Sequence, residues 1–313
     1  MDTILQGLRA TAEPTRLRIL GICAHGELTV SELCQILGQS QPRVSRHLKL
    51  LVEAGLLDRF QEGNHAYYRL AENGACAALG RSIIDQIPHD DPNLSLDLDR
   101  LERVKAARAQ FAAEYFRRNA ARWNELRALH VDDRQVDAAL RALLLEAPVH
   151  DLLDIGTGTG RVLELMGPDV DAAVGIDTSR EMLSVARTNL DKAALSHCQV
   201  RQADMYQLPF TGERFDAVTL HMVLHYADDP SRVVAEAARV LRPNGRLIVV
   251  DFAPHAMNLL RDEHAHRWMG FADDAMASFL GDAGLSGHRK IELPGTPLTV
   301  CLWQGQRAPA AIH

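Results

Sequence analysis

The sequence has few residues of the types that mark disulfide-rich or metal-bound proteins. Its 313 residues include five cysteines that share no metal-like spacing: Cys23, Cys34, Cys76, Cys198 and Cys301. Such an odd, dispersed set indicates reduced thiols that pack as small hydrophobic side chains, which predicts a cytoplasmic protein without a metal site. No apolar stretch approaches the roughly 20 residues that a membrane-spanning helix needs, so we expect no membrane partner.

A net basic charge is also lacking, because the formal charge is −7. This argues against a protein coated in basic surface, although a local basic patch can hide in such a sum. The start of the chain has no basic segment before an apolar block, so we predict no signal peptide. With 47% hydrophobic and 24% charged residues, the chain has an ordinary globular composition and enough length for two domains.

Residues 1–87 contain short helical patterns interrupted by glycine. Thr29 or Ser31 can cap a helix that runs to about residue 37 and ends at Gly38. Ser40 can cap a second helix over 41–54, which a further glycine terminates. Two short helices joined by a tight turn predict a helix-turn-helix.

Two strand patterns follow, at 56–60 and 66–70, with a hairpin tip at 61–65, and they predict a β-wing. The second helix and the wing carry residues suited to base edges and phosphates: Gln41, Arg43, Ser45, Arg46, Lys49, Arg59 and Arg69. A solvated helix face that happens to be basic is the alternative. The concentration of cations on one helix favours DNA binding.

The motifs of this region resemble those of the ArsR/SmtB family of bacterial winged-helix repressors. They are Glu13-Pro-Thr-Arg-Leu-Arg-Ile-Leu20, Ser40-Gln-Pro-Arg-Val-Ser-Arg-His-Leu-Lys49, Glu53-Ala-Gly-Leu-Leu57 and Tyr67-Tyr-Arg-Leu70. The resemblance implies a homodimer formed through helices at about 2–12 and 73–87. It also implies binding to double-stranded operator DNA with a palindromic sequence.

One departure from that family concerns metal sensing. Many members bind metal through two cysteines in the segment that corresponds to residues 27–33, where this chain has Thr29 and Ser31. Hydroxyl groups are poor ligands for soft metals. We therefore expect the regulatory signal to come from elsewhere in the chain.

The remaining sequence predicts a linker with connecting helices at 88–130 and an α/β domain at 131–305. Pro88 and Pro92 interrupt a polar stretch and mark the boundary. Strand patterns then alternate with helices, which predicts a doubly wound, Rossmann-like parallel sheet. The expected strands are 152–155, 172–177, 200–203, 215–220 and 247–252, and a terminal antiparallel hairpin is expected from 289–293 and 298–303.

A glycine loop follows the first of these strands, at Asp154-Ile-Gly-Thr-Gly-Thr-Gly160. Glycines here let the backbone turn sharply and approach a nucleotide, and by itself the loop allows two classes of nucleotide site. The Gly-x-Gly-x-Gly spacing, with an acid two residues before it, is not the dinucleotide fingerprint. Asp177 lies about 20 residues beyond the glycines, where an acid can bind ribose hydroxyls.

Five motifs in order resemble the class I S-adenosylmethionine-dependent methyltransferases. They are the glycine loop, Gly175-Ile-Asp177, Ala203-Asp-Met205, Phe215-Asp216 and Leu241-Arg-Pro-Asn-Gly-Arg-Leu247. The resemblance implies S-adenosylmethionine or S-adenosylhomocysteine as ligand. The binding residues that it implies are Asp154, Gly156, Thr157, Gly158, Gly160, Asp177, Thr178, Asp204, Met205 and His221. Asp177 would bind the ribose, Asp204 the adenine amino group and Asp154 the cationic part of the ligand, with Met205 packed on the adenine ring.

The sequence is less specific about chemistry. Methyl transfer needs mainly alignment, with a base only where the acceptor carries a proton. His221 and His225 follow the fourth strand and are the candidate catalytic residues, and the predicted acceptor is a small molecule. Two hypotheses remain: a transcriptional regulator that senses the ligand, or an active methyltransferase whose winged helix serves dimerisation or feedback.

Overall fold

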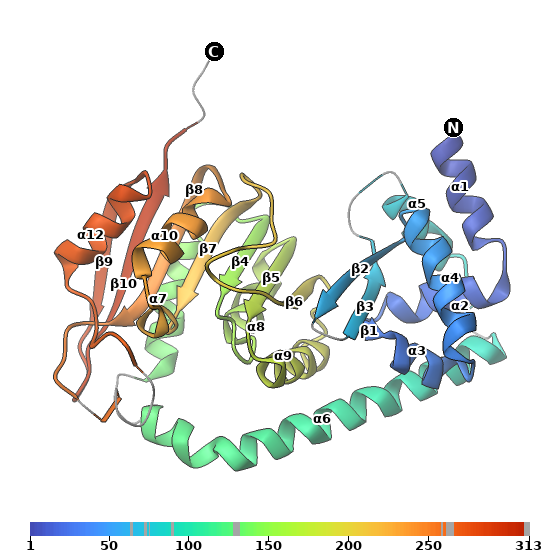
Figure 1. The fold of residues 1–313 in the computed structure, drawn as a ribbon, viewed down its shortest axis with the longest axis horizontal. Helices are drawn as coiled ribbons and strands as arrows, with labels where there is room; N and C mark the ends of the chain where they lie inside the picture. The colour runs from blue at the N-terminus through green and yellow to red at the C-terminus, as the bar shows by residue number, and fades with distance from the viewer. Residues whose placement is uncertain are drawn as a thin grey trace. The chain divides into compact units, whose positions relative to one another are not determined.

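The computed structural model describes residues 1–62, 65–71, 74, 76–88, 91–127, 132–257, 259–260 and 266–309. Contacts divide the chain into two units, 1–111 and 112–313. The elements of the first unit are α1 (Asp2–Thr11), α2 (Pro14–Cys23), β1 (Leu28–Thr29), α3 (Val30–Leu37), α4 (Gln41–Glu53), β2 (Leu57–Glu62), β3 (His65–Leu70), α5 (Ala77–Ile84) and the start of α6 (Pro92–Arg127). Figure 1 shows the order of these elements.

The predicted helix-turn-helix is formed by α3 and α4. Thr29 caps α3 in a capping box with Glu32, and Gly38 ends the helix with a φ of 65°. Ser40 stands at the N-cap of α4 but makes no side-chain cap bond, which differs from its predicted role. The wing strands pair with each other, and β3 also pairs with β1, which the sequence did not predict.

The start of α6 packs into the core of this first unit. Leu101 and Val104 are 1% and 4% exposed within a core that also contains residues of α2, α3 and α4. Arg108 donates to both carboxylate oxygens of Glu32, at 2.8 and 2.7 Å. The residues predicted as linker and connecting helices, 88–130, therefore include a helix whose first turns belong to the N-terminal unit.

The second unit holds a seven-stranded sheet among the described residues, with the order β6-β5-β4-β7-β8-β10-β9. Its strands are β4 (Asp151–Ile155), β5 (Ala172–Asp177), β6 (Cys198–Gln202), β7 (Phe215–His221), β8 (Leu241–Phe252), β9 (Leu285–Leu293) and β10 (Val300–Arg307). Strands β4 to β8 are parallel, and β10 runs antiparallel between β8 and β9. The predicted doubly wound fold and terminal hairpin are confirmed, although β8, β9 and β10 are longer than predicted.

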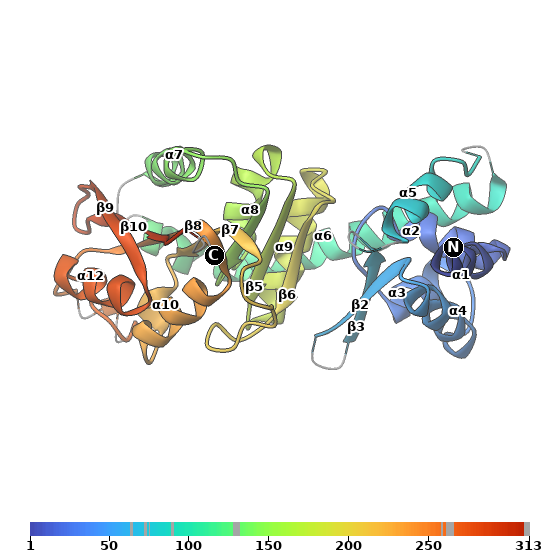
Figure 2. The same cartoon turned by 90° about the horizontal axis from the view of Figure 1, so that it is seen from above.

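Helices cover both faces of this sheet (Figure 2). They are α7 (Asp133–Leu144), α8 (Arg161–Met166), α9 (Arg180–Lys192), α10 (Pro230–Arg239) and α12 (Asp273–Asp282), with short 3₁₀ turns η1 (Gly167–Asp169) and η2 (Leu224–Tyr226). Successive strand residues point to opposite faces, so Leu152 packs with α7, α8 and α9 while Leu153 packs with α10 and α12. Because β4 is covered on both faces, its carboxyl end presents the glycine loop at a fixed edge.

Candidate functional site

The glycine loop leaves β4 through residues that have left-handed backbone conformations. Gly156 has a φ of 72°, and a Cβ there would lie 2.3 Å from Val223 Cγ2. Gly158 has a φ of 52°, and no described atom lies within 4 Å of the position of its Cβ. Gly156 is therefore required by packing, whereas Gly158 borders open space that a ligand can enter.

Asp177, at the carboxyl end of β5, holds this loop. Its carboxylate accepts hydrogen bonds from the backbone N–H groups of Gly158 at 2.9 Å and Ser179 at 2.8 Å. The neighbouring Thr157 is 6% exposed and donates its N–H to the carbonyl of Ile176 at 2.8 Å, while Thr178 is exposed. Asp177 thus orders the glycine loop, and its predicted contact with a ribose stays a prediction.

Asp154 lies beneath the loop with an exposure of 1%. The Thr219 hydroxyl donates to its Oδ1 at 2.6 Å. Burial raises the pKa of this carboxyl to about 7, although the hydroxyls of Thr219 and Thr157 oppose the shift. Asp154 is thus buried at the base of the loop and bound by Thr219 of β7, and its predicted roles in holding the loop and in contacting a cationic ligand stay predictions.

Asp204 and Met205 follow β6, on the far side of β5 from the glycine loop. Asp204 is exposed and accepts the N–H of Tyr206 at 2.9 Å, which fixes its carboxylate in a turn. Met205 is half-buried against the core beneath α10 and α12. Asp177 and Asp204 therefore lie at the carboxyl ends of adjacent strands. Their predicted contacts, with the ribose and the adenine of one nucleoside, require such neighbouring positions.

His221 ends β7, on the other side of β4. Burial of the imidazole and the positive charge of Arg161 lower the pKa of His221 to about 4. Its Nε2 is buried and has no hydrogen-bond partner among the described residues. The ring is therefore neutral in neutral solution, and its catalytic and binding roles stay predictions.

His225, the second candidate catalytic residue, is 2% exposed. Its Nδ1 lies 2.8 Å from Asp251 Oδ1, and its ring stacks on His266 with centroids 3.8 Å apart. Asp251 also accepts the backbone N–H groups of His225 and Phe252, at 3.1 and 2.8 Å. The structure therefore buries His225 in a fixed orientation, in which the pair with Asp251 orients the loop after β7.

The candidate DNA-contacting residues divide by exposure. Four of them are exposed on α4, namely Gln41, Arg43, Arg46 and Lys49, whereas Ser45 is half-buried. Arg59 is exposed on the wing, where it donates to Gln61 at 3.0 Å. Arg69, the other wing arginine noted in the sequence, is 6% exposed and pairs with Asp58. The reason is its place in β3, where the side chain lies across from β2.

Two family profiles match the chain. The profile described as bacterial regulatory protein, arsR family, matches residues 13–59, and the profile described as methyltransferase domain matches residues 153–249. The chain joins an arsR-family regulatory module to a methyltransferase domain. The first match contains α3 and α4, and the second begins within β4, contains the glycine loop and ends within β8.

Relatives resemble parts of this fusion. The chain is 34% identical over 106 residues to the uncharacterized methyltransferase YcgJ of Bacillus subtilis, an alignment that covers 34% of this chain and 42% of the relative. It is 39% identical over 101 residues to a phosphatidylethanolamine N-methyltransferase of Cereibacter sphaeroides, with 32% and 49% covered. The chain thus spans less than half the length of these curated relatives.

One solved structure supports the fold. Magnesium protoporphyrin IX methyltransferase from Synechocystis, solved with bound S-adenosylhomocysteine, covers 62% of this chain with a TM-score of 0.50 and 20% identity, and 97% of that chain is matched. At this identity the likeness concerns the fold alone. No described helix of the fusion has an apolar stretch long enough to cross a membrane.

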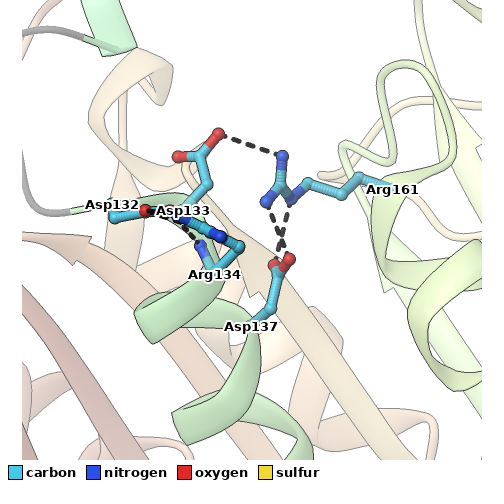
Figure 3. Close-up of polar contacts among 5 residues, drawn as sticks. All are labelled: Asp132, Asp133, Arg134, Asp137 and Arg161. Carbon is cyan, nitrogen blue, oxygen red and sulfur yellow. Dashed lines mark hydrogen bonds and ion pairs between the residues drawn. The ribbon is translucent and has the colours of Figure 1, made fainter.

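Three charged residues beside the glycine loop were not predicted from the sequence. Arg161 follows Gly160 directly, and it pairs with Asp133 and Asp137 of α7 (Figure 3). The spacing of the two aspartates, four residues apart on a helix, was the available signal, because it places both carboxylates on one face. Their partner could not be predicted, since Asp133 and Arg161 lie 28 residues apart in the sequence and meet only through the packing of α7 near α8.

Proposed function

We propose that this fusion is a transcriptional regulator whose methyltransferase domain binds S-adenosylmethionine or S-adenosylhomocysteine and thereby changes the affinity for operator DNA. The observation that carries the proposal is helix α6. Its first turns are part of the core of the regulatory module, and the same helix continues past residue 111 into the second unit. A change at either end of a continuous helix can alter the other, which is the physical requirement for coupling two sites.

The proposed DNA interface is supported by exposure and charge. Arg43, Arg46 and Lys49 are exposed on one helix, which follows a tight turn after α3. Guanidinium groups suit both guanine edges and phosphates. A homodimer would present two such helices to a palindromic operator.

The proposed dimer is supported by the outer face of α1. Ile4, Leu5 and Leu8 are 49%, 41% and 45% exposed, although they recur at helical spacing. Removing such a stripe from water is favourable, and a second copy of the chain would cover it. Sedimentation of the full chain tests this point, and Leu8→Glu should shift the equilibrium to monomer.

Titration of DNA binding tests the coupling. The probe is the genomic fragment that the ligand-free protein selects, and its affinity is measured alone, with S-adenosylmethionine and with S-adenosylhomocysteine. We expect a change of roughly 5- to 150-fold with at least one ligand. Asp177→Ala should abolish the response because the glycine loop loses its anchor. Equal DNA affinities under conditions in which calorimetry shows bound ligand would contradict the proposal.

A second candidate function is methyl transfer to a small-molecule acceptor. Asp251 orients His225 in the loop after β7, next to the edge where a methyl group and its acceptor would meet. Incubation with methyl-labelled S-adenosylmethionine and a cell extract tests this function. Labelled product is expected from the wild type and a strongly reduced amount from Asp251→Asn. Tight ligand binding without any labelled product would leave only the sensing function.

A further inference from the structure

Arg161, Asp133 and Asp137 form a charged cluster directly after the glycine loop. Arg161 donates from Nε to Asp137 Oδ1 at 3.0 Å, from Nη2 to Asp137 Oδ2 at 2.7 Å and from Nη1 to Asp133 Oδ2 at 3.0 Å. Figure 3 shows the guanidinium between the two carboxylates, while Asp132 is paired separately with Arg134. One cation directly after the glycine loop thus faces two anions of α7.

The cluster remains accessible to solvent. The side chains of Arg161, Asp133 and Asp137 are 35%, 28% and 23% exposed. Ion pairs with this much exposure contribute little to folding, because water screens them. A guanidinium has five N–H donors, and three donate within this cluster, so the group can also bind a carboxylate ligand. Arg161 can therefore bind a ligand while the cluster also joins α7 to α8.

The sheet order gives the place of the cluster along the ligand edge. Asp204 follows β6, Asp177 is the last residue of β5, and the glycine loop follows β4. His221 is the last residue of β7, on the opposite side of β4, and the charges of all three cluster residues affect its pKa. A ligand whose nucleoside lies over β6 and β5 would therefore extend its other end across the loop toward the cluster.

We propose that Arg161, Asp133 and Asp137 bind the α-amino acid group of the ligand. This assignment rests on the proposed binding of S-adenosylmethionine or S-adenosylhomocysteine. Arg161 would donate to the α-carboxylate, and the two aspartates would accept from the α-ammonium, because a zwitterion is complementary to one cation beside two anions. The cluster then selects nucleoside ligands that carry an amino acid and discriminates against those that do not.

Calorimetry on the full chain tests the assignment with two probes. S-adenosylhomocysteine and 5′-methylthioadenosine share the adenosine and the thioether, but only the first has the amino acid group. We expect Arg161→Gln and Asp137→Asn each to weaken S-adenosylhomocysteine binding by roughly 10- to 100-fold, the loss typical of a charged hydrogen bond. Binding of 5′-methylthioadenosine should stay within about twofold of the wild type, because this ligand lacks the groups that the two side chains would contact.

Arg141→Gln is the matched control. Arg141 also lies on α7 and forms a bidentate pair, with Asp169, so its loss perturbs the same helix outside the cluster. It should leave both affinities unchanged. Arg161→Lys should recover part of the S-adenosylhomocysteine affinity, because it restores the charge without the planar fork.

The outcomes separate this assignment from the proposed function. If the wild type binds S-adenosylhomocysteine and the Arg161 and Asp137 variants keep its preference over 5′-methylthioadenosine, the assignment is wrong and the function stands. Equal losses of affinity for both probes would show that the cluster only links α7 to α8 and does not contact the amino acid group. A wild type that binds neither S-adenosylmethionine nor S-adenosylhomocysteine would overturn both.

Discussion

Arg18 of α2 and Asp97 of α6 form a bidentate ion pair across 79 residues of sequence, with Nε–Oδ2 and Nη2–Oδ1 distances of 2.6 and 2.7 Å. The Asp97 side chain is fully buried, whereas Arg18 is 21% exposed. The hydrogen bond from Arg18 to Asp97 raises the pKa of the Arg18 guanidinium. This ion pair anchors α6 to α2, which is part of the core of the regulatory module. Helix α6 is the helix that continues beyond that module.

Replacing Arg18 should destabilise the regulatory module. Arg18→Ala leaves the buried Asp97 carboxylate without its main partner, a change that typically costs about 3 kcal/mol or more of the free energy of unfolding. Hydrogen exchange followed by mass spectrometry reports on α2 and the start of α6 separately from the second unit. Arg103→Ala, an exposed position on the same helix, should change exchange little, and equal protection in both variants would contradict the role of the pair.

The length of the regulatory module can be tested by truncation. A chain that ends at residue 111 retains Leu101 and Val104 in the core, whereas one that ends at residue 87 exposes the surface that they cover. We expect the longer chain to unfold cooperatively in urea at a higher midpoint, because burial of each such side chain stabilises by about 1.5–3 kcal/mol. Equal midpoints would show that α6 is dispensable for the module.

The raised pKa of Asp154 predicts a specific pH dependence of the free energy of unfolding. Its pKa rises from 3.8 in the unfolded chain to about 7 in the folded domain, so the folded state binds the proton more tightly. The stabilising contribution is complete below pH 3.8 and is lost as the pH rises to about 7. Relative to Asp154→Asn, the wild type should lose up to about 4 kcal/mol across this range. Urea unfolding at several pH values measures the difference, and a constant difference would contradict the burial argument.

The exposed basic side chains of α4 predict how DNA affinity depends on salt. Arg46→Ala should weaken operator binding and, if the side chain contacts phosphate, lower the slope of log affinity against log salt by about one. A base contact would instead cost about 1–3 kcal/mol at one position of the operator. Arg134→Ala is the matched control, since Arg134 has an 88% exposed side chain in the other unit. A similar effect of both substitutions would argue against a specific role for α4.

Local patterns in the sequence determined the elements of both units. The strand that ends at Ile155, the glycines that follow it and the cap of α3 at Thr29 each depend on neighbours within a few residues. Steric limits on glycine and the hydrogen-bonding needs of helix ends act over this short range. For that reason the helix-turn-helix and the doubly wound sheet could be predicted before any contact was known.

Tertiary structure alone decided which side chains meet. Arg69 is a basic residue of the wing, and the pairing of β2 with β3 places it against Asp58. Arg161 meets Asp137, and Arg18 meets Asp97, only because strands and helices distant in the sequence pack together. Such pairs depend on sheet order and helix packing, which follow from burial of the whole core and leave no local periodic signal.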